Sequence, residues 1–290
     1  MLLLQLLVDG LQLGALYALM AVGFAVIFGS TRVFHYAHGT TYVLVGYLFY
    51  WMAERLAVPW WLAAALAALA GVVFGVVLDR FVYRPIQRDE GSFFTVFVAS
   101  FGVGVVVENL VVIFFGASFV SISTPLTRVT DIGGGIVISY LGICSMLIAV
   151  ALFVLLNWLL ARTDVGVALR ALSENPELVR GFGLNPRKLS QYAFAIGSLL
   201  VAPAALVATC VTGLTPSAGH RVVLISIAAS IIGGIGSLRG AGFGGLILGL
   251  AESMAVWKLS TGWSEAVAFV ILFCFILARP SGLFGIRARV

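Results

Sequence analysis

The sequence predicts an all-α, polytopic membrane protein, and two properties of its composition lead to that prediction. Of its 290 residues, 61% are hydrophobic and only 10% are charged. An ordinary water-soluble globule could not keep so much apolar surface away from water. Because the bilayer core offers no water to backbone groups, spanning segments must be helices or closed barrels, and long uncharged runs fit helices. We expect a single transmembrane domain over residues 1–290.

Long apolar runs with few or no charged residues predict about nine membrane spans. They cover residues 10–29, 40–53, 57–78, 91–115, 136–161, 190–212, 222–236, 240–257 and 262–278. Spans 40–53, 222–236 and 240–257 are short against the roughly 20 residues that a crossing helix needs. Short spans in transporters are often broken helices.

The basic residues predict the orientation. Cytoplasmic loops of membrane proteins carry an excess of Lys and Arg. With the N-terminus outside, four of the seventeen basic residues, Arg55, Arg128, Arg221 and Lys258, fall outside, and the other thirteen fall on the cytoplasmic side. We therefore expect the N-terminus outside and the C-terminus in the cytoplasm.

The longest polar stretch, residues 162–190, is predicted to fold into a docking surface. Asn175 can cap a helix that begins at Pro176 and ends near Phe182, and Gly183 can end it in a left-handed turn. An apolar set exposed on such a loop is typical of a partner surface; the alternative is that it lies against the membrane or the chain's own helices. The residues expected to couple to a partner are Arg170, Glu174, Asn175, Pro176, Glu177, Leu178, Val179, Phe182, Gly183 and Asn185.

Two patterns point to broken helices around a path. Eight glycines fall within residues 233–249. They favour close helix packing. The alternative is that they also expose backbone groups along a path. Loops with Ala37-His38-Gly39 and Ala218-Gly219-His220 each follow a long predicted helix, and the two units run in opposite directions. Inverted repeats of this kind commonly build a transport path at their interface.

Few ionisable side chains lie within or next to the predicted spans. Glu108 and Glu252 fall inside predicted spans, where a carboxylate is either a functional group or one held by neighbouring backbone. His35 and His38 lack the carboxylate partners of a metal site, so loop packing is the alternative to a gating role. We assign to a translocation path or gate His35, Tyr36, His38, Gly39, Gly234, Gly236, Glu108 and Glu252. We expect no catalytic set, no cofactor and no metal site, and no phosphate-binding loop for ATP is present.

Three stretches together resemble the LivH-type permeases of ATP-binding-cassette importers for branched-chain amino acids. The first joins residues 14–19 and 28–29 to Ala37-His38-Gly39-Thr40. The second runs from Leu169-Arg170-Ala171 through Glu174-Asn175-Pro176-Glu177 to Gly183-Leu184-Asn185. The third is residues 233–241 with Gly244-Gly245 and Glu252. His35 and Tyr36 depart from the family, which usually has Asn-Phe there.

The resemblance implies a type II importer fold in the inner membrane of a bacterium. It also implies four kinds of partner: a second homologous permease, two cytoplasmic ATPase subunits that hydrolyse the ATP, a periplasmic solute-binding protein, and a small solute. Relatives carry branched-chain or other amino acids, urea or short amides. The net charge of +5 reflects orientation signals rather than nucleic-acid binding. The alternatives are an ion-coupled secondary transporter of a small polar solute and an intramembrane enzyme.

Overall fold

The computed structural model describes residues 2–88, 92–131, 136–234, 236–259, 263–279 and 281–284. Its first half contains α1 (Leu2–Thr31), α2 (His38–Tyr50) with a π-helical turn (Trp51–Arg55), α3 (Trp60–Leu78), a second π-helical turn (Asp79–Tyr83), α4 (Arg84–Arg88), α5 (Phe93–Phe115) and a 3₁₀ turn (Pro125–Thr127). Strands β1 (Val129–Asp131) and β2 (Val137–Ser139) pair antiparallel, and this hairpin was not predicted. The second half contains α6 (Tyr140–Arg162), α7 (Asp164–Glu174), α8 (Pro176–Gly181), α9 (Pro186–Val211), α10 (Ala218–Gly233), α11 (Leu238–Ala255) and α12 (Ser264–Ala278).

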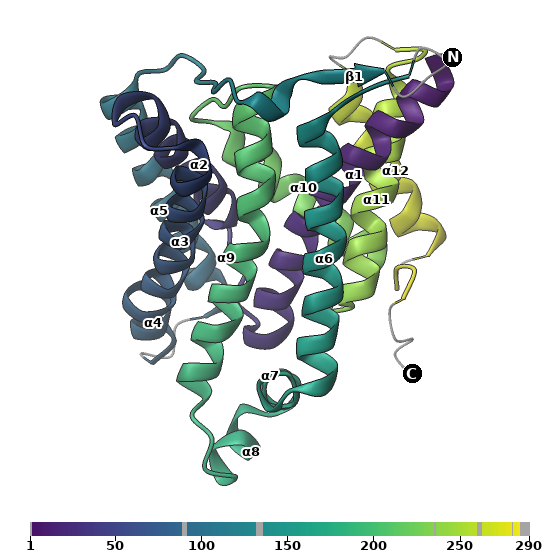
Figure 1. Cartoon of the computed structure of the whole chain (residues 1–290). Coiled ribbons are helices and arrows are strands. Elements are labelled where there is room, and N and C mark those ends of the chain that lie inside the picture. Colours follow the sequence, from purple (N-terminus) through teal and green to yellow (C-terminus); the bar gives the residue numbers. More distant parts are fainter. Residues whose placement is uncertain are drawn as a thin grey trace.

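The helices form a bundle with two different ends (Figure 1). The β-hairpin lies at one end, which we call the hairpin end, and α7 and α8 project from the opposite, α7–α8 end. Helix α1 begins at the hairpin end, where the Gln5 side chain donates to the Val137 carbonyl at 2.9 Å. Helix α9 begins after α8 and ends near the hairpin end, where Ile122 N–H donates to the Thr209 carbonyl at 3.1 Å. The two long helices therefore run in opposite directions.

Each predicted span matches a helix, but their lengths differ. By length and composition, the described residues contain five helices able to cross a membrane, or six if the bent pair α10–α11 counts as one span. The predicted span 57–78 ends where α3 ends, at Leu78, but the helical run continues through the π-helical turn and α4 to Arg88. Asp79 does not end it, since this carboxylate is only 1% exposed and pairs with the Arg84 guanidinium at 2.8 Å. A paired charge can stay inside a helical bundle.

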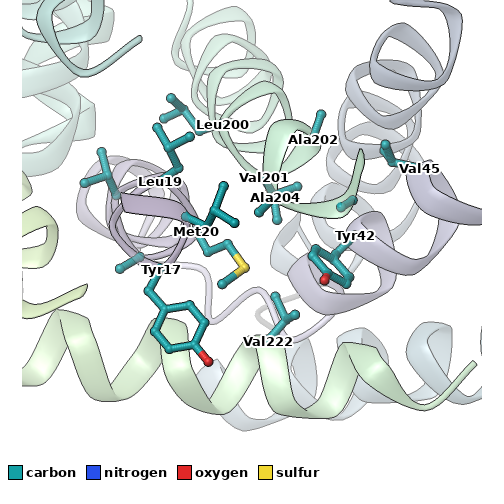
Figure 2. Packing of buried hydrophobic residues seen from close by; sticks show 14 of the residues in the cluster. Tyr17, Leu19, Met20, Tyr42, Val45, Leu200, Val201, Ala202, Ala204 and Val222 are labelled. Atoms are coloured by element: carbon teal, nitrogen blue, oxygen red, sulfur yellow. The ribbon is translucent and has the colours of Figure 1, made fainter. Parts of the chain in front are cut away.

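Helix α1 is the centre of the core. Figure 2 shows its Leu19 and Met20 packed near Leu200 of α9, Tyr42 of α2 and Val222 of α10. Against α11, α1 packs through small residues instead. A Cβ on Gly249 would lie 2.2 Å from the backbone nitrogen of Gly14, and one on Gly245 would lie 2.4 Å from that of Ala18. Without side chains between them the backbones approach closely, as the glycine pattern predicted.

The short helices α2 and α10 begin inside the bundle and touch there. A Cβ on Gly39 would lie 2.0 Å from the Gly219 carbonyl oxygen, so only glycine fits this contact. Each helix follows a long helix and a short connection, residues 32–37 before α2 and 212–217 before α10. Since α1 and α9 run in opposite directions, the two units have the inverted relation that the sequence predicted.

Candidate functional site

The predicted coupling loop contains a capped helix with exposed apolar side chains. Asn175 Oδ1 accepts hydrogen bonds from the backbone N–H groups of Glu177 and Leu178, each at 3.0 Å, and α8 follows from Pro176. Gly183 has the predicted left-handed backbone, with φ +77°. Leu178 and Phe182 are 58% and 76% exposed. Asn185 caps α9 by accepting from Arg187 N–H at 3.0 Å.

Two residues of this loop differ from the prediction. Val179 is only 2% exposed and packs in the core, so it anchors α8 to the bundle rather than facing outward. Arg170 donates to the carbonyl oxygen of Leu160 and so ties α7 to the last turn of α6. The apolar surface of α8 therefore rests on Leu178 and Phe182.

Helix α7 was not predicted. It begins where the Thr163 hydroxyl accepts from Gly166 N–H at 3.2 Å, and it turns straight back on α6. A Cβ on Gly166 would lie 2.4 Å from the Cα of Leu160, so this sharp return needs glycine. Leu169 and Leu172 are buried. The apolar spacing of 165, 168, 169 and 172 was the available signal for this helix.

A polar cluster forms where α2 and α10 begin. The Tyr36 hydroxyl lies 2.8 Å from His220 Nδ1, and His220 Nε2 lies 2.9 Å from Glu108 Oε2 on α5. With Nε2 donating to the carboxylate, Nδ1 can accept the tyrosine proton. Gly39 lies beside them at the α2–α10 contact, and the three side chains line one surface pocket. His220 was not among the predicted site residues, because Tyr36 is 184 residues away in the sequence and Glu108 lies on another helix.

The two histidines of the first loop are enclosed. His35 and His38 are both 0% exposed. His35 Nδ1 lies 2.8 Å from the Tyr83 hydroxyl, and His38 Nε2–H donates to the Met20 carbonyl at 3.0 Å. These contacts favour the packing role that we weighed against gating, and they hold the turn between α1 and α2 in place.

The second membrane carboxylate is also paired. Glu252 of α11 is 5% exposed; its Oε2 accepts from the Tyr17 hydroxyl at 2.7 Å, and its Oε1 pairs with Arg221. Arg221 lies within α10, so placing it in an outside loop was wrong. The span expected at 222–236 begins earlier, at Ala218, because this arginine has a carboxylate partner inside the bundle.

The glycines of the α10–α11 turn have a backbone role. Gly234 and Gly236 adopt φ +102° and +90°, a left-handed region that favours glycine. No atoms would obstruct a Cβ on Gly236, so its conformation, rather than close packing, selects the residue. Gly236 and Arg239 line a cavity of about 340 Å³ with Arg170 at the α7–α8 end. Among the described residues, no group of three His, Cys, Asp or Glu could hold a metal ion.

Known proteins resemble the chain along its whole length. The family model for the branched-chain amino acid transport system / permease component matches residues 6–276. The chain is 30% identical to the high-affinity branched-chain amino acid transport system permease protein BraD of Pseudomonas aeruginosa, over 97% of this chain and 95% of that protein. It is 26% identical to LivH of Escherichia coli, with the same two coverages.

One solved structure shares the fold. PsaBC from Streptococcus pneumoniae in complex with Fab matches with a TM-score of 0.51 and 13% identity, over 98% of this chain and 92% of that one. The family model covers both broken units and the capped loop between them. The chain therefore belongs to the family of permease components of branched-chain amino acid transport systems.

Proposed function

We propose that this permease carries branched-chain or other amino acids into the cytoplasm, driven by ATPase subunits that dock on α8. The observation that carries the proposal is the exposed pair Leu178 and Phe182 on a helix that is capped at its start and anchored through buried Val179. The cap at Asn175 and the anchor at Val179 hold this short helix rigidly. A movement of a bound ATPase would therefore be transmitted from α8 to the bundle through the adjoining helices α7 and α9. Exposed apolar patches on such supports are typical partner surfaces.

The partners follow from the family. A second homologous permease would complete the path, two ATPase subunits would bind the α7–α8 end, and a periplasmic solute-binding protein would deliver the solute at the hairpin end. This orientation puts the N-terminus outside and the α7–α8 end in the cytoplasm. Arg32, which donates to the Ser173 carbonyl, and Arg84, which donates to the Arg187 carbonyl, lie at that end, as the positive-inside rule requires.

We place the solute path beside the cluster of Tyr36, His220 and Glu108. Its carboxylate suits the ammonium group of an amino acid. The rings of Phe97 and Phe101 lie 6.1 and 5.1 Å from the Tyr36 ring and suit an apolar side chain. Gly39 lies at the α2–α10 contact beside this cluster. Gly234 and Gly236 lie at the α10–α11 turn, so they could affect the path only by fixing the conformation of that turn.

The ion-coupled alternative gains no support. It calls for carboxylates available to bind a coupling ion, and Glu108 and Glu252 are the candidates. Glu252 is held by Tyr17 and Arg221, and Glu108, beside His220, is the carboxylate that we assign to the solute.

The test is uptake of labelled leucine by proteoliposomes that contain the permeases, the ATPases and the binding protein. We expect uptake to need both ATP and the binding protein, and Leu178→Asp/Phe182→Asp to abolish it while the ATPases fail to co-purify. The matched control is Val129→Asp, at an exposed apolar site of the hairpin end, which should keep the ATPases. Normal co-purification of the ATPases with the double variant would refute the docking assignment, and uptake driven by an ion gradient alone would refute the importer.

A further inference from the structure

A cavity of about 710 Å³ at the α7–α8 end is lined by five arginines and one carboxylate. Its walls come from the end of α1, from α4, from α7 and α8, and from the start of α9. The arginines are Arg32, Arg84, Arg88, Arg180 and Arg187, and the carboxylate is Glu174. Five cations against one anion leave a strong excess of positive charge around one open cavity.

Two of these arginines bond to other groups of the protein, and three are available to bind a ligand. Arg84 pairs with the buried Asp79 at 2.8 Å, and Arg32 donates to the Ser173 carbonyl at 3.5 Å. Among the described residues, no carboxylate lies within ion-pair distance of Arg88, Arg180 or Arg187. Three guanidinium groups therefore line the cavity with no ion-pair partner in the part of the chain that the structure describes.

The cavity lies where membrane helices end. Thr31 is the last residue of α1, Arg84 the first of α4 and Arg187 the second of α9, and all three line it. In Figure 1, α4 and the start of α9 lie above the projecting α8. Exposed apolar rings flank Arg84 and Arg88 along the chain, Phe81 before them and Phe93 and Phe94 after them, at 65%, 58% and 69% exposure. A ligand here meets cations at headgroup depth and apolar side chains toward the membrane.

We propose that this cavity binds the phosphate headgroup of an anionic phospholipid. Guanidinium groups bind phosphate oxygens through paired hydrogen bonds, and basic pockets between helix ends are suited to anionic headgroups. A soluble phosphate could satisfy the arginines but would leave the neighbouring rings uncovered. An acidic segment of a docked protein would approach from the projecting α8, which supplies only Arg180 of these arginines, whereas Arg84, Arg88 and Arg187 come from α4 and the start of α9.

The experiment measures phospholipid retained by the purified full-length chain, using native mass spectrometry and nanodiscs that contain phosphatidylcholine with or without phosphatidylglycerol. Arg88→Gln/Arg187→Gln removes two available cations and leaves the Arg84–Asp79 pair and α8 intact. Since one guanidinium near an anionic headgroup contributes about fivefold in affinity, the double variant should bind phosphatidylglycerol roughly thirtyfold more weakly. Arg55→Gln/Arg128→Gln removes the same charge from exposed sites outside the cavity and should bind as the original chain does.

A second measurement guards against misfolding. Phosphatidylglycerol should raise the thermal stability of the original chain, and not that of Arg88→Gln/Arg187→Gln, because a ligand stabilises only a state that binds it. Equal retention by the two chains would overturn the proposal. So would displacement of the lipid by millimolar inorganic phosphate, which would identify a free-anion site. Loss of ATPase co-purification with unchanged lipid would identify a protein partner instead.

Discussion

Several glycines of this protein lie directly against the backbone of a neighbouring helix. Gly245 and Gly249 of α11 lie against Ala18 and Gly14 of α1, at distances where a methyl group would overlap main-chain atoms. Backbone cannot move aside as a flexible side chain can, so the whole helix would have to shift. These positions are therefore sensitive to a single added carbon.

We expect Gly245→Ala to destabilise the bundle by about 1–3 kcal/mol, the usual cost of overpacking. Its new Cβ would lie 2.4 Å from the backbone nitrogen of Ala18. The matched control is Gly29→Ala on α1, where nothing lies within 4 Å of an added Cβ. Thermal unfolding in detergent checks both, and equal stability of the two variants would contradict the α1–α11 packing.

The Glu252–Arg221 pair makes a second prediction. Glu252→Gln leaves Arg221 without its partner, and Arg221→Gln leaves a buried carboxylate uncompensated. Breaking a buried pair from one side costs about 3–5 kcal/mol, and somewhat less here because Arg221 is 46% exposed. The double variant Glu252→Gln/Arg221→Gln should therefore be more stable than Arg221→Gln alone. Additive losses in a double-mutant cycle would show that the two side chains act independently.

Short helices in this chain depend on their ends. Helix α8 has only the six residues Pro176–Gly181, too few to persist without support. Its cap at Asn175 and its anchor at Val179 supply that support from opposite sides. The exposed pair of Leu178 and Phe182 is thus oriented by residues that do not touch a partner.

Asn175→Ala should loosen α8 while leaving the bundle folded. It removes the acceptor for the N–H groups of Glu177 and Leu178, which costs about 1 kcal/mol. Amide hydrogen exchange over residues 176–181 should become roughly fivefold faster, because that free energy sets the opening equilibrium. Asn175→Asp keeps an acceptor oxygen and should exchange at the original rate. Unchanged exchange in Asn175→Ala would mean that the anchor alone holds the helix.

Sequence patterns predicted the elements that local chemistry defines. The cap at Asn175 and the left-handed Gly183 both depend on neighbours within a few residues, and both are confirmed. Counting apolar runs did not show that the helical run continues past Asp79, because the Arg84 guanidinium that neutralises it cannot be seen in a hydropathy pattern. It failed at Arg221 for the same reason.

Contacts between distant segments were beyond such patterns. Burial separates Val179 from Leu178 and Phe182, although all three are apolar and close in sequence. His220 joins the site only because α10 begins against α2, which brings it to Tyr36 and Glu108. The broken units were predicted, but which of their side chains meet was set by packing.

The distribution of arginines over the bundle predicts how it sits in the membrane. Arg170 and Arg239 line one cavity at the α7–α8 end, whereas Arg128 adjoins the β-hairpin at the other end. The positive-inside rule then assigns the α7–α8 end to the cytoplasm. Arg221 no longer counts toward either side, because it is paired within the bundle.

Single cysteines in a background without Cys144, Cys210 and Cys274 check this orientation. On intact cells, an impermeant thiol reagent should label a cysteine at Arg128 and leave one at Arg239 unlabelled. Permeabilised cells should label both, which controls for access. Labelling at position 239 and not at 128 on intact cells would reverse the orientation.

The central place of α1 also fixes an order of events during synthesis. Tyr17 bonds to Glu252, which is 235 residues later in the chain. At 5–20 residues per second, the first helix to be made waits roughly 10–50 s for that partner. Until α11 has been synthesised, the surface of α1 around Gly14, which packs against α11 in the finished protein, has only lipid to contact. A nascent chain that stops before Leu238 lacks α11, so this surface of α1 stays uncovered. Membrane quality control can therefore distinguish unfinished chains from finished ones by this surface.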